Sequence, residues 1–92
     1  SDEHRSLHDL LLAAESIEIT WLRLEAGSPL TGQTLREADI RSRTGASVIA
    51  LIRDGELLAN PKSVTAFEAG DQLGLIGDSE QIEAARSWLL ES

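Results

Sequence analysis

The chain has 92 residues, of which 16 are acidic and 8 are basic, so its net charge at neutral pH is −8. A surface this acidic repels phosphate backbones and anionic lipid headgroups, which excludes nucleic acid and membrane surfaces as expected partners. The chain contains no cysteine, so it has no disulfide and no thiolate metal site. Its length allows one domain. Its apolar runs are far shorter than the ~20 residues of a membrane-spanning helix, so we expect no direct membrane insertion.

The first 15 residues predict an amphipathic helix. Leu7, Leu10, Leu11 and Ala14 recur at helical spacing and form one apolar stripe. A helix of ~12 residues is only marginally stable in isolation. We therefore expect the stripe to dock on this domain, on a second copy of it or on a neighbouring domain. The chain also lacks methionine, so we expect it to be a fragment of a longer protein.

An alternating pattern predicts the first strand over residues 17–25. Ile19 and Trp21 alternate with polar residues, but Leu22 and Leu24 then continue the apolar pattern in the opposite phase. Such a change of phase requires a β-bulge or burial of both strand faces. Both faces of a small sheet are buried only if something else covers the second face.

Turn and capping signals predict a helix after this strand. The residues Gly27-Ser28-Pro29 form a turn, and Thr34 with Glu37 three residues later fits a capping box. Gly45 is able to take the left-handed conformation that ends a helix. We therefore expect one short helix between Thr34 and Gly45.

The rest of the sequence predicts three strands and a final helix. Residues 48–52 are uninterruptedly apolar and read as a strand buried on both sides. Asp54-Gly55 suits a tight hairpin turn that leads into a return strand over residues 56–59. Residues 72–76 form the last strand, and Asp78 or the serine after it caps the final helix.

The element order is thus a helix followed by β-α-β-β-β-α, with the helix in residues 1–15 and the domain itself in residues 16–92. We expect an α+β fold in two layers with a small mixed sheet. No nucleophile–base pair, metal cluster or carboxylate dyad stands out in the sequence, so we expect no enzyme activity.

The order and spacing of these residues resemble the C-terminal domain of the regulator-of-K⁺-conductance family, also called the RCK C-terminal or TrkA-C domain. The resemblance covers roughly residues 16–90. It rests on the following groups: Gly27-Ser28-Pro29-Leu30-x-Gly32-x-x-Leu35, Arg41-x-x-x-Gly45-x-x-Val48-Ile49-Ala50-x-x-Arg53, Asn60-Pro61 and Gly70-Asp71-x-Leu73-x-x-Ile76-Gly77.

The resemblance implies a cytoplasmic ligand-sensing regulatory domain of a monovalent-cation transport protein, carrying K⁺ or exchanging Na⁺ for H⁺. Such domains dimerise and gate transport by a ligand-driven rearrangement, and they act at the cytoplasmic side of the cell membrane. The expected partners are a second copy of the chain and a membrane-embedded channel or transporter segment. Residues 1–15 would be the connector from the preceding domain. The alternative is a structural dimerisation module with no ligand of its own.

Some members of the family bind cyclic di-AMP in the cleft between two such domains. By the resemblance, Arg41 would contact phosphate, and Ser47 would take a polar place that is usually asparagine in those members. Apolar side chains would hold the bases, and the matching positions are Leu35, Val48, Ile49 and Pro61.

Two of these assignments have plainer alternatives. Arg41 and Arg43 either grip a phosphate or are exposed cations near a helix C-terminus, where positive charge is favoured. A divalent cation is a second possible regulatory ligand, because Asp78, Glu80 and Glu83 are the oxygen donors that Ca²⁺ prefers. These three carboxylates also suit a helix N-terminus without any ion.

Overall fold

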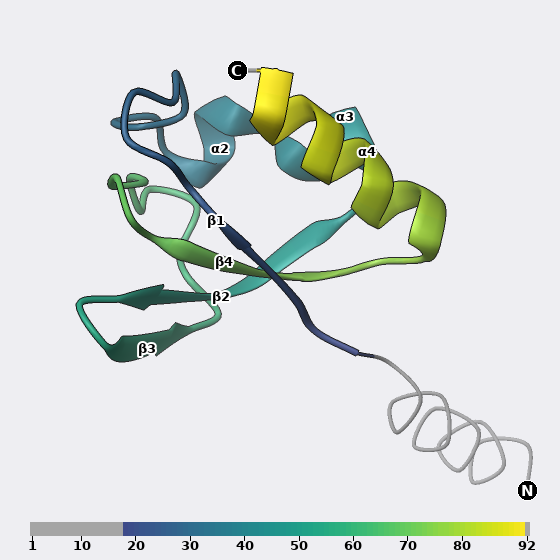
Figure 1. The fold of residues 1–92 in the computed structure, drawn as a ribbon. Helices are drawn as coiled ribbons and strands as arrows, with labels where there is room; N and C mark the ends of the chain where they lie inside the picture. Colours follow the sequence, from purple (N-terminus) through teal and green to yellow (C-terminus); the bar gives the residue numbers. More distant parts are fainter. Residues whose placement is uncertain (1–17, 92) are drawn as a thin grey trace, which may run out of the picture.

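The computed structural model describes residues 18–91, which form a twisted sheet with helices over one of its faces (Figure 1). The helix expected over residues 1–15 lies outside the described residues. The elements in chain order are β1 (Thr20–Arg23), α2 (Leu35–Ala38), α3 (Ile40–Thr44), β2 (Ser47–Arg53), β3 (Glu56–Ala59), β4 (Gln72–Ile76) and α4 (Ser79–Glu91).

The four strands lie in the order β1-β4-β2-β3, and every neighbouring pair is antiparallel. The α+β fold is therefore confirmed, but the expected mixed sheet is wrong. The helical connection does make β1 and β2 run in the same direction. However, β4 lies between these two strands and pairs antiparallel with both, so no parallel pair forms.

The predicted strands differ from the structure mainly at their ends. The predictions for β3 and β4 match to the residue, and β2 is one residue longer at each end than expected. The strand expected over residues 17–25 is shorter in the structure. It ends at Arg23, and the backbone of Leu24 forms hydrogen bonds with the loop before β4 instead. The Leu24 N–H donates to the Asp71 carbonyl at 2.8 Å, and the Leu24 carbonyl accepts from Gly70 at 2.8 Å.

The change of phase in β1 places apolar side chains on both faces of the sheet. Leu22 and Leu24 are buried under the helices, whereas Ile19 and Trp21 lie on the opposite face and are 45% and 39% exposed. The bulge is in β2, where the register with β4 shifts between Val48 and Ala50. Among residues 18–91, no helix covers the face that carries Trp21 (Figure 1).

The helix expected between Thr34 and Gly45 is interrupted. Asp39 has a left-handed backbone with φ 51°, which ends α2 and begins α3 in a new direction. The capping box at its start is confirmed, since the Glu37 N–H donates to Thr34 Oγ1 at 3.1 Å and the Thr34 N–H to Glu37 Oε1 at 3.0 Å. Gly45, with φ 84°, ends α3 as predicted.

The final helix α4 begins with a second reciprocal cap. The Gln81 N–H donates to Asp78 Oδ1 at 2.8 Å, and the Asp78 N–H donates to Gln81 Oε1 at 2.8 Å. Ala85 is fully buried, and Ile82 and Leu89 pack against the core beside it. The predicted apolar stripe of this helix is thereby confirmed.

The core lies between the helices and one face of the sheet. Its sheet side consists of leucines from β1, β2 and β4, and its helix side consists of small and branched residues. Phe67 closes the core from the loop that precedes β4. The buried residues of this cluster are Leu22, Leu24, Leu30, Ala38, Ile40, Ala46, Leu51, Phe67, Leu73, Leu75 and Ala85.

A buried carboxylate, Asp71, fastens the end of β2 to the loop before β4. Arg53 donates two hydrogen bonds to it, from Nε at 2.9 Å and from Nη2 at 2.7 Å, and pairs with Glu68 at 2.7 Å. The Glu68 N–H also donates to Asp71 at 2.9 Å. Burial alone would raise the pKa of Asp71, but these hydrogen bonds and the Arg53 charge hold that pKa below its usual value.

Candidate ligand-binding cleft

A cleft of about 390 Å³ opens between the α2–α3 junction, the start of β2 and the loop after β3. Five of the six residues that the resemblance marks for a ligand contribute to it. The residues that line the cleft are Leu35, Asp39, Ile40, Arg41, Ser47, Val48, Pro61 and Ser63.

The outer wall of the cleft is held in place by backbone hydrogen bonds from the start of α2. The Leu35 N–H donates to the Thr65 carbonyl and the Arg36 N–H to the Ser63 carbonyl, both at 3.0 Å. These bonds fix the loop that carries Pro61 beside the helix. They also occupy two of the amides that a helix N-terminus leaves free, so an anion in the cleft must rely on side chains.

The two arginines of α3 have different environments. The Arg41 side chain is exposed, lines the cleft and makes no hydrogen bond or ion pair with another described residue. Arg43 turns the other way, where its Nε donates to the Ala38 carbonyl at 3.1 Å and its guanidinium lies 5.5 Å from the ring centre of Trp88. Arg43 thus connects α3 to α4, and only Arg41 of the pair faces the cleft.

Ser47 and Val48 enter the cleft from the first two positions of β2. Ser47 pairs with Ile76, and Val48 pairs with Leu75 before the register shifts. Ile49 falls at this bulge and does not line the cleft, unlike the other five marked residues. The resemblance marked Ile49 together with Val48, and the register shift between β2 and β4 falls at Ile49.

Asp39 is a cleft residue that the sequence analysis missed. It is exposed, stands two positions before Arg41 and brings a carboxylate to the same cleft. Its proximity to Arg41 in the sequence is a signal that would have found it. The sequence gives no indication that Ser63 lines the cleft, because its loop approaches α2 only in the folded chain.

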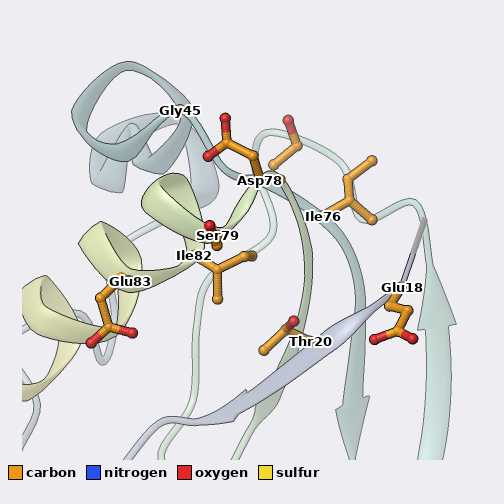
Figure 2. A pocket seen from close by; sticks show the side chains of 10 residues that line it. Glu18, Thr20, Gly45, Ile76, Asp78, Ser79, Ile82 and Glu83 are labelled. Carbon is orange, nitrogen blue, oxygen red and sulfur yellow. The ribbon is translucent and has the colours of Figure 1, made fainter. Parts of the chain in front are cut away.

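Ser47 also lines a second hollow, of about 780 Å³. Figure 2 shows Glu18 and Thr20 on one side of it and Ile82 and Glu83 of α4 on the other. Its rim carries three carboxylates, from Glu18, Asp78 and Glu83, and Glu80 does not line it.

Asp78, at the start of α4, caps the helix. The Asp78 side chain accepts the Gln81 N–H and so acts as the N-cap. Within residues 18–91, no group of three metal-ligating side chains is arranged to hold a metal ion. The helix-capping alternative therefore accounts for Asp78 without a divalent cation.

No helix in the described part of the chain has the length and apolar character needed to cross a bilayer.

The fold and the cleft define a small α+β domain with an open cleft, and comparison with known proteins identifies its family. The TrkA-C domain model matches residues 19–90, so the chain belongs to the TrkA-C family, whose members are regulatory rather than catalytic. This confirms the resemblance stated from the sequence.

Two relatives are potassium transport proteins. The chain is 31% identical over 80 residues to the K(+)/H(+) antiporter subunit KhtT of Bacillus subtilis, covering 86% of this chain and 48% of KhtT. It is 30% identical over 69 residues to the probable potassium channel protein 2 of Methanocaldococcus jannaschii, covering 75% of this chain and 20% of that protein. The chain thus spans about half of the first relative and a fifth of the second.

Three solved structures share the fold. The RCK C domain of the potassium transport protein KtrA, in complex with cyclic di-AMP, is 27% identical with a TM-score of 0.70, over 97% of this chain and 99% of that one. The GsuK channel bound to NAD is 26% identical with a TM-score of 0.72, over 96% and 17%. The RCK_C domain dimer of Streptococcus agalactiae BusR with cyclic di-AMP has a TM-score of 0.75 at 19% identity, over 80% and 91%.

Proposed function

We propose that the chain is a cytoplasmic ligand-sensing domain of a potassium or other monovalent-cation transport protein, and that it acts as a homodimer. Its ligand is a cyclic dinucleotide of the cyclic di-AMP class, which binds across two facing copies of the cleft. Binding favours one arrangement of the two copies, and the segment before β1 passes this rearrangement to the transport machinery.

The observation that carries this proposal is the exposed Arg41 side chain beside an apolar wall. Leu35, Val48 and Pro61 offer a surface for a base, while Arg41 offers a guanidinium that has no partner among residues 18–91. A guanidinium makes two-pronged hydrogen bonds to phosphate, and two copies would supply one arginine for each phosphate of a cyclic dinucleotide. The complex of KtrA with cyclic di-AMP, at 27% identity, supports the choice of ligand.

The exposed edge of the sheet is consistent with a dimer in which a second copy of the chain forms the other half of the site. In the described part of the chain no strand pairs with the outer side of β3, and Leu58 is 43% exposed on the helix-covered face. Val64 in the adjoining loop is 72% exposed, between two residues whose carbonyls bond to α2. Burying such side chains against a twin would stabilise a dimer that closes the cleft.

A calorimetric titration of the 92-residue chain with cyclic di-AMP tests the proposal. We expect half a ligand per chain, because one molecule spans two copies. At 100 times its dissociation constant the ligand should add about 2.7 kcal/mol to the free energy of unfolding, which thermal denaturation measures.

Two variants that each remove one positive charge distinguish a direct contact in the cleft from a general effect of the protein's charge. Arg41→Ala should abolish the heat of binding. Arg36→Ala should leave it nearly unchanged, because Arg36 is exposed and does not line the cleft. Equal losses in both variants would contradict the assignment of Arg41.

The alternative is a structural dimerisation module that binds no ligand. Asp39 favours it, because its carboxylate lies in the same cleft and opposes an anionic ligand. A folded chain that sediments as a dimer and gives no heat with cyclic di-AMP would support this alternative. A strictly monomeric chain at tens of micromolar would contradict both.

A further inference from the structure

A groove runs along the outer side of β1, beside α4. It consists of two hollows of about 230 Å³ and 180 Å³, which share Arg23, Glu25 and Leu89 and together follow residues 21–28. The strands β1 and β3 lie at opposite edges of the sheet (Figure 1). No described residue lines both this groove and the ligand-binding cleft, so the two sites are separate.

The backbone of β1 offers hydrogen-bonding groups to this groove. Among residues 18–91, no strand pairs with the outer side of β1. Leu24, which follows β1, bonds to the loop before β4 with both its N–H and its carbonyl. The direction of these groups alternates along a strand in an antiparallel pair, so Leu22 also faces β4, and the groups of Trp21 and Arg23 point outward. An extended segment is able to pair with such an edge.

The charged side chains of the groove carry a local excess of positive charge on an otherwise acidic chain. Arg23 and Arg86 line the groove, and Glu25 is its one carboxylate among the described residues. Arg23 is exposed and makes no hydrogen bond or ion pair with another described residue. Arg86 pairs with Glu83 at 3.6 Å, but both side chains are exposed, so this pair is weak and easily exchanged. The charges therefore favour a negatively charged occupant.

We propose that the groove binds an extended acidic segment of a partner protein, which adds a strand to the β1 edge. Backbone hydrogen bonds to Trp21 and Arg23 hold the segment, and one of its carboxylates pairs with the Arg23 guanidinium. Its apolar side chains pack on Trp21, which is 39% exposed, and on the partly buried Leu89. Opposite charges and aromatic–aliphatic pairs on neighbouring strands are both stabilising. This binding needs no ligand in the cleft, so it goes beyond the proposed function.

Amide hydrogen exchange of the free 92-residue chain, followed by NMR, tests whether the β1 edge is available. We expect fast exchange at Trp21 and Arg23, and slow exchange at Leu22 and Leu24, whose N–H groups face β4. Protection of Trp21 and Arg23 in the free chain would show that this chain or a second copy already occupies the edge. That result would overturn the proposal.

A titration with a model peptide tests the binding itself. The probe is a five-residue peptide of alternating glutamate and valine with both ends blocked, which matches residues 21–25 in length. At millimolar peptide, the amide protons of Trp21 and Arg23 should move downfield and reach a plateau, as new hydrogen bonds form. The same peptide methylated on its backbone nitrogens keeps its charge but cannot pair as a strand. Equal shifts with both peptides, or no shift at Trp21 and Arg23, would overturn the proposal.

Three charge variants test the role assigned to Arg23. Arg23→Gln should weaken binding of the unmethylated peptide by roughly 3- to 5-fold, the effect of one exposed ion pair. Glu25→Gln should strengthen binding by a similar factor, because it removes the carboxylate that repels the peptide. Arg36→Gln is the matched control, since Arg36 is exposed and lies outside the groove. Equal weakening by Arg23→Gln and Arg36→Gln, or weaker binding by Glu25→Gln, would contradict the assignment.

Discussion

The clearest electrostatic feature at the scale of single residues is the pairing of Arg53 with Asp71. Asp71 is 1% exposed, so its charge is tolerated only because Arg53 and the Glu68 N–H compensate it. The same hydrogen bonds raise the pKa of Arg53 above its usual value, so the pair stays charged at neutral pH. The interaction ties the end of β2 to the loop before β4.

Replacing Asp71 by Asn should reveal this coupling as a pH dependence. We expect Asp71→Asn to lower the free energy of unfolding at pH 7 by about 2–3 kcal/mol, since it removes charged hydrogen bonds from a buried site. The folded-state pKa of Asp71 is lowered, so its contribution is complete above the unfolded pKa of about 3.9 and declines as the pH falls toward the folded pKa. Urea denaturation from pH 7 to pH 3 measures the difference between the two proteins. A difference that stays constant over this range would contradict the assignment.

Asp39 is expected to weaken anion binding in the cleft. Asp39→Asn removes the carboxylate while keeping a residue that tolerates the left-handed backbone, so the fold should be unaffected. We expect tighter binding of cyclic di-AMP by roughly 5- to 10-fold, the effect of removing about 1 kcal/mol of like-charge repulsion near a protein surface. Calorimetry measures the gain, and weaker binding by the variant would show that Asp39 contacts the ligand favourably.

At the scale of the elements, local signals predicted much of this fold. The hairpin turn is an example, since Asp54 and Gly55 both have positive φ, at 52° and 78°. The break at Asp39 was not predictable, because a single left-handed residue inside a capped helix leaves no periodic signal. The strand order was not predictable either, since the insertion of β4 between β1 and β2 depends on contacts between distant segments.

The capping box of α2 should stabilise the fold although α2 is short, because the same turn holds the wall of the cleft. We expect Thr34→Ala to cost about 1 kcal/mol in the free energy of unfolding, the usual loss for a capping side chain. The control is Thr31→Ala, an exposed residue whose side chain makes no hydrogen bond with another described residue. Thermal denaturation compares the two, and equal losses would show that the capping box contributes little.

The cleft itself was only partly predictable from sequence. Arg41, Ser47 and Val48 lie close together in the chain, and a family resemblance was enough to mark them. Pro61 joins them only because the loop after β3 returns to α2, as its backbone hydrogen bonds show. Ile49 was marked by the same resemblance but does not line the cleft, and it lies at the register shift in β2.

At the scale of the whole molecule, a net charge of −8 opposes an anionic ligand. Exposed charges are screened over about 8 Å at physiological ionic strength, so the groups inside the cleft decide the interaction. Arg41 and Asp39 are the charged residues that line it. Binding of a cyclic dinucleotide should therefore depend far more on these two side chains than on the overall charge.

The outer edge of β3 has a practical consequence for handling the purified chain. All four residues of β3 are exposed, and no strand among residues 18–91 pairs with this edge, so its backbone can template strand-to-strand association between molecules. Mutual repulsion of highly charged chains suppresses such association, but this protection vanishes near the isoelectric point of about 4.5. Dilute, mildly alkaline solutions should keep the protein colloidally stable, and mildly acidic buffers should precipitate it before its fold is lost.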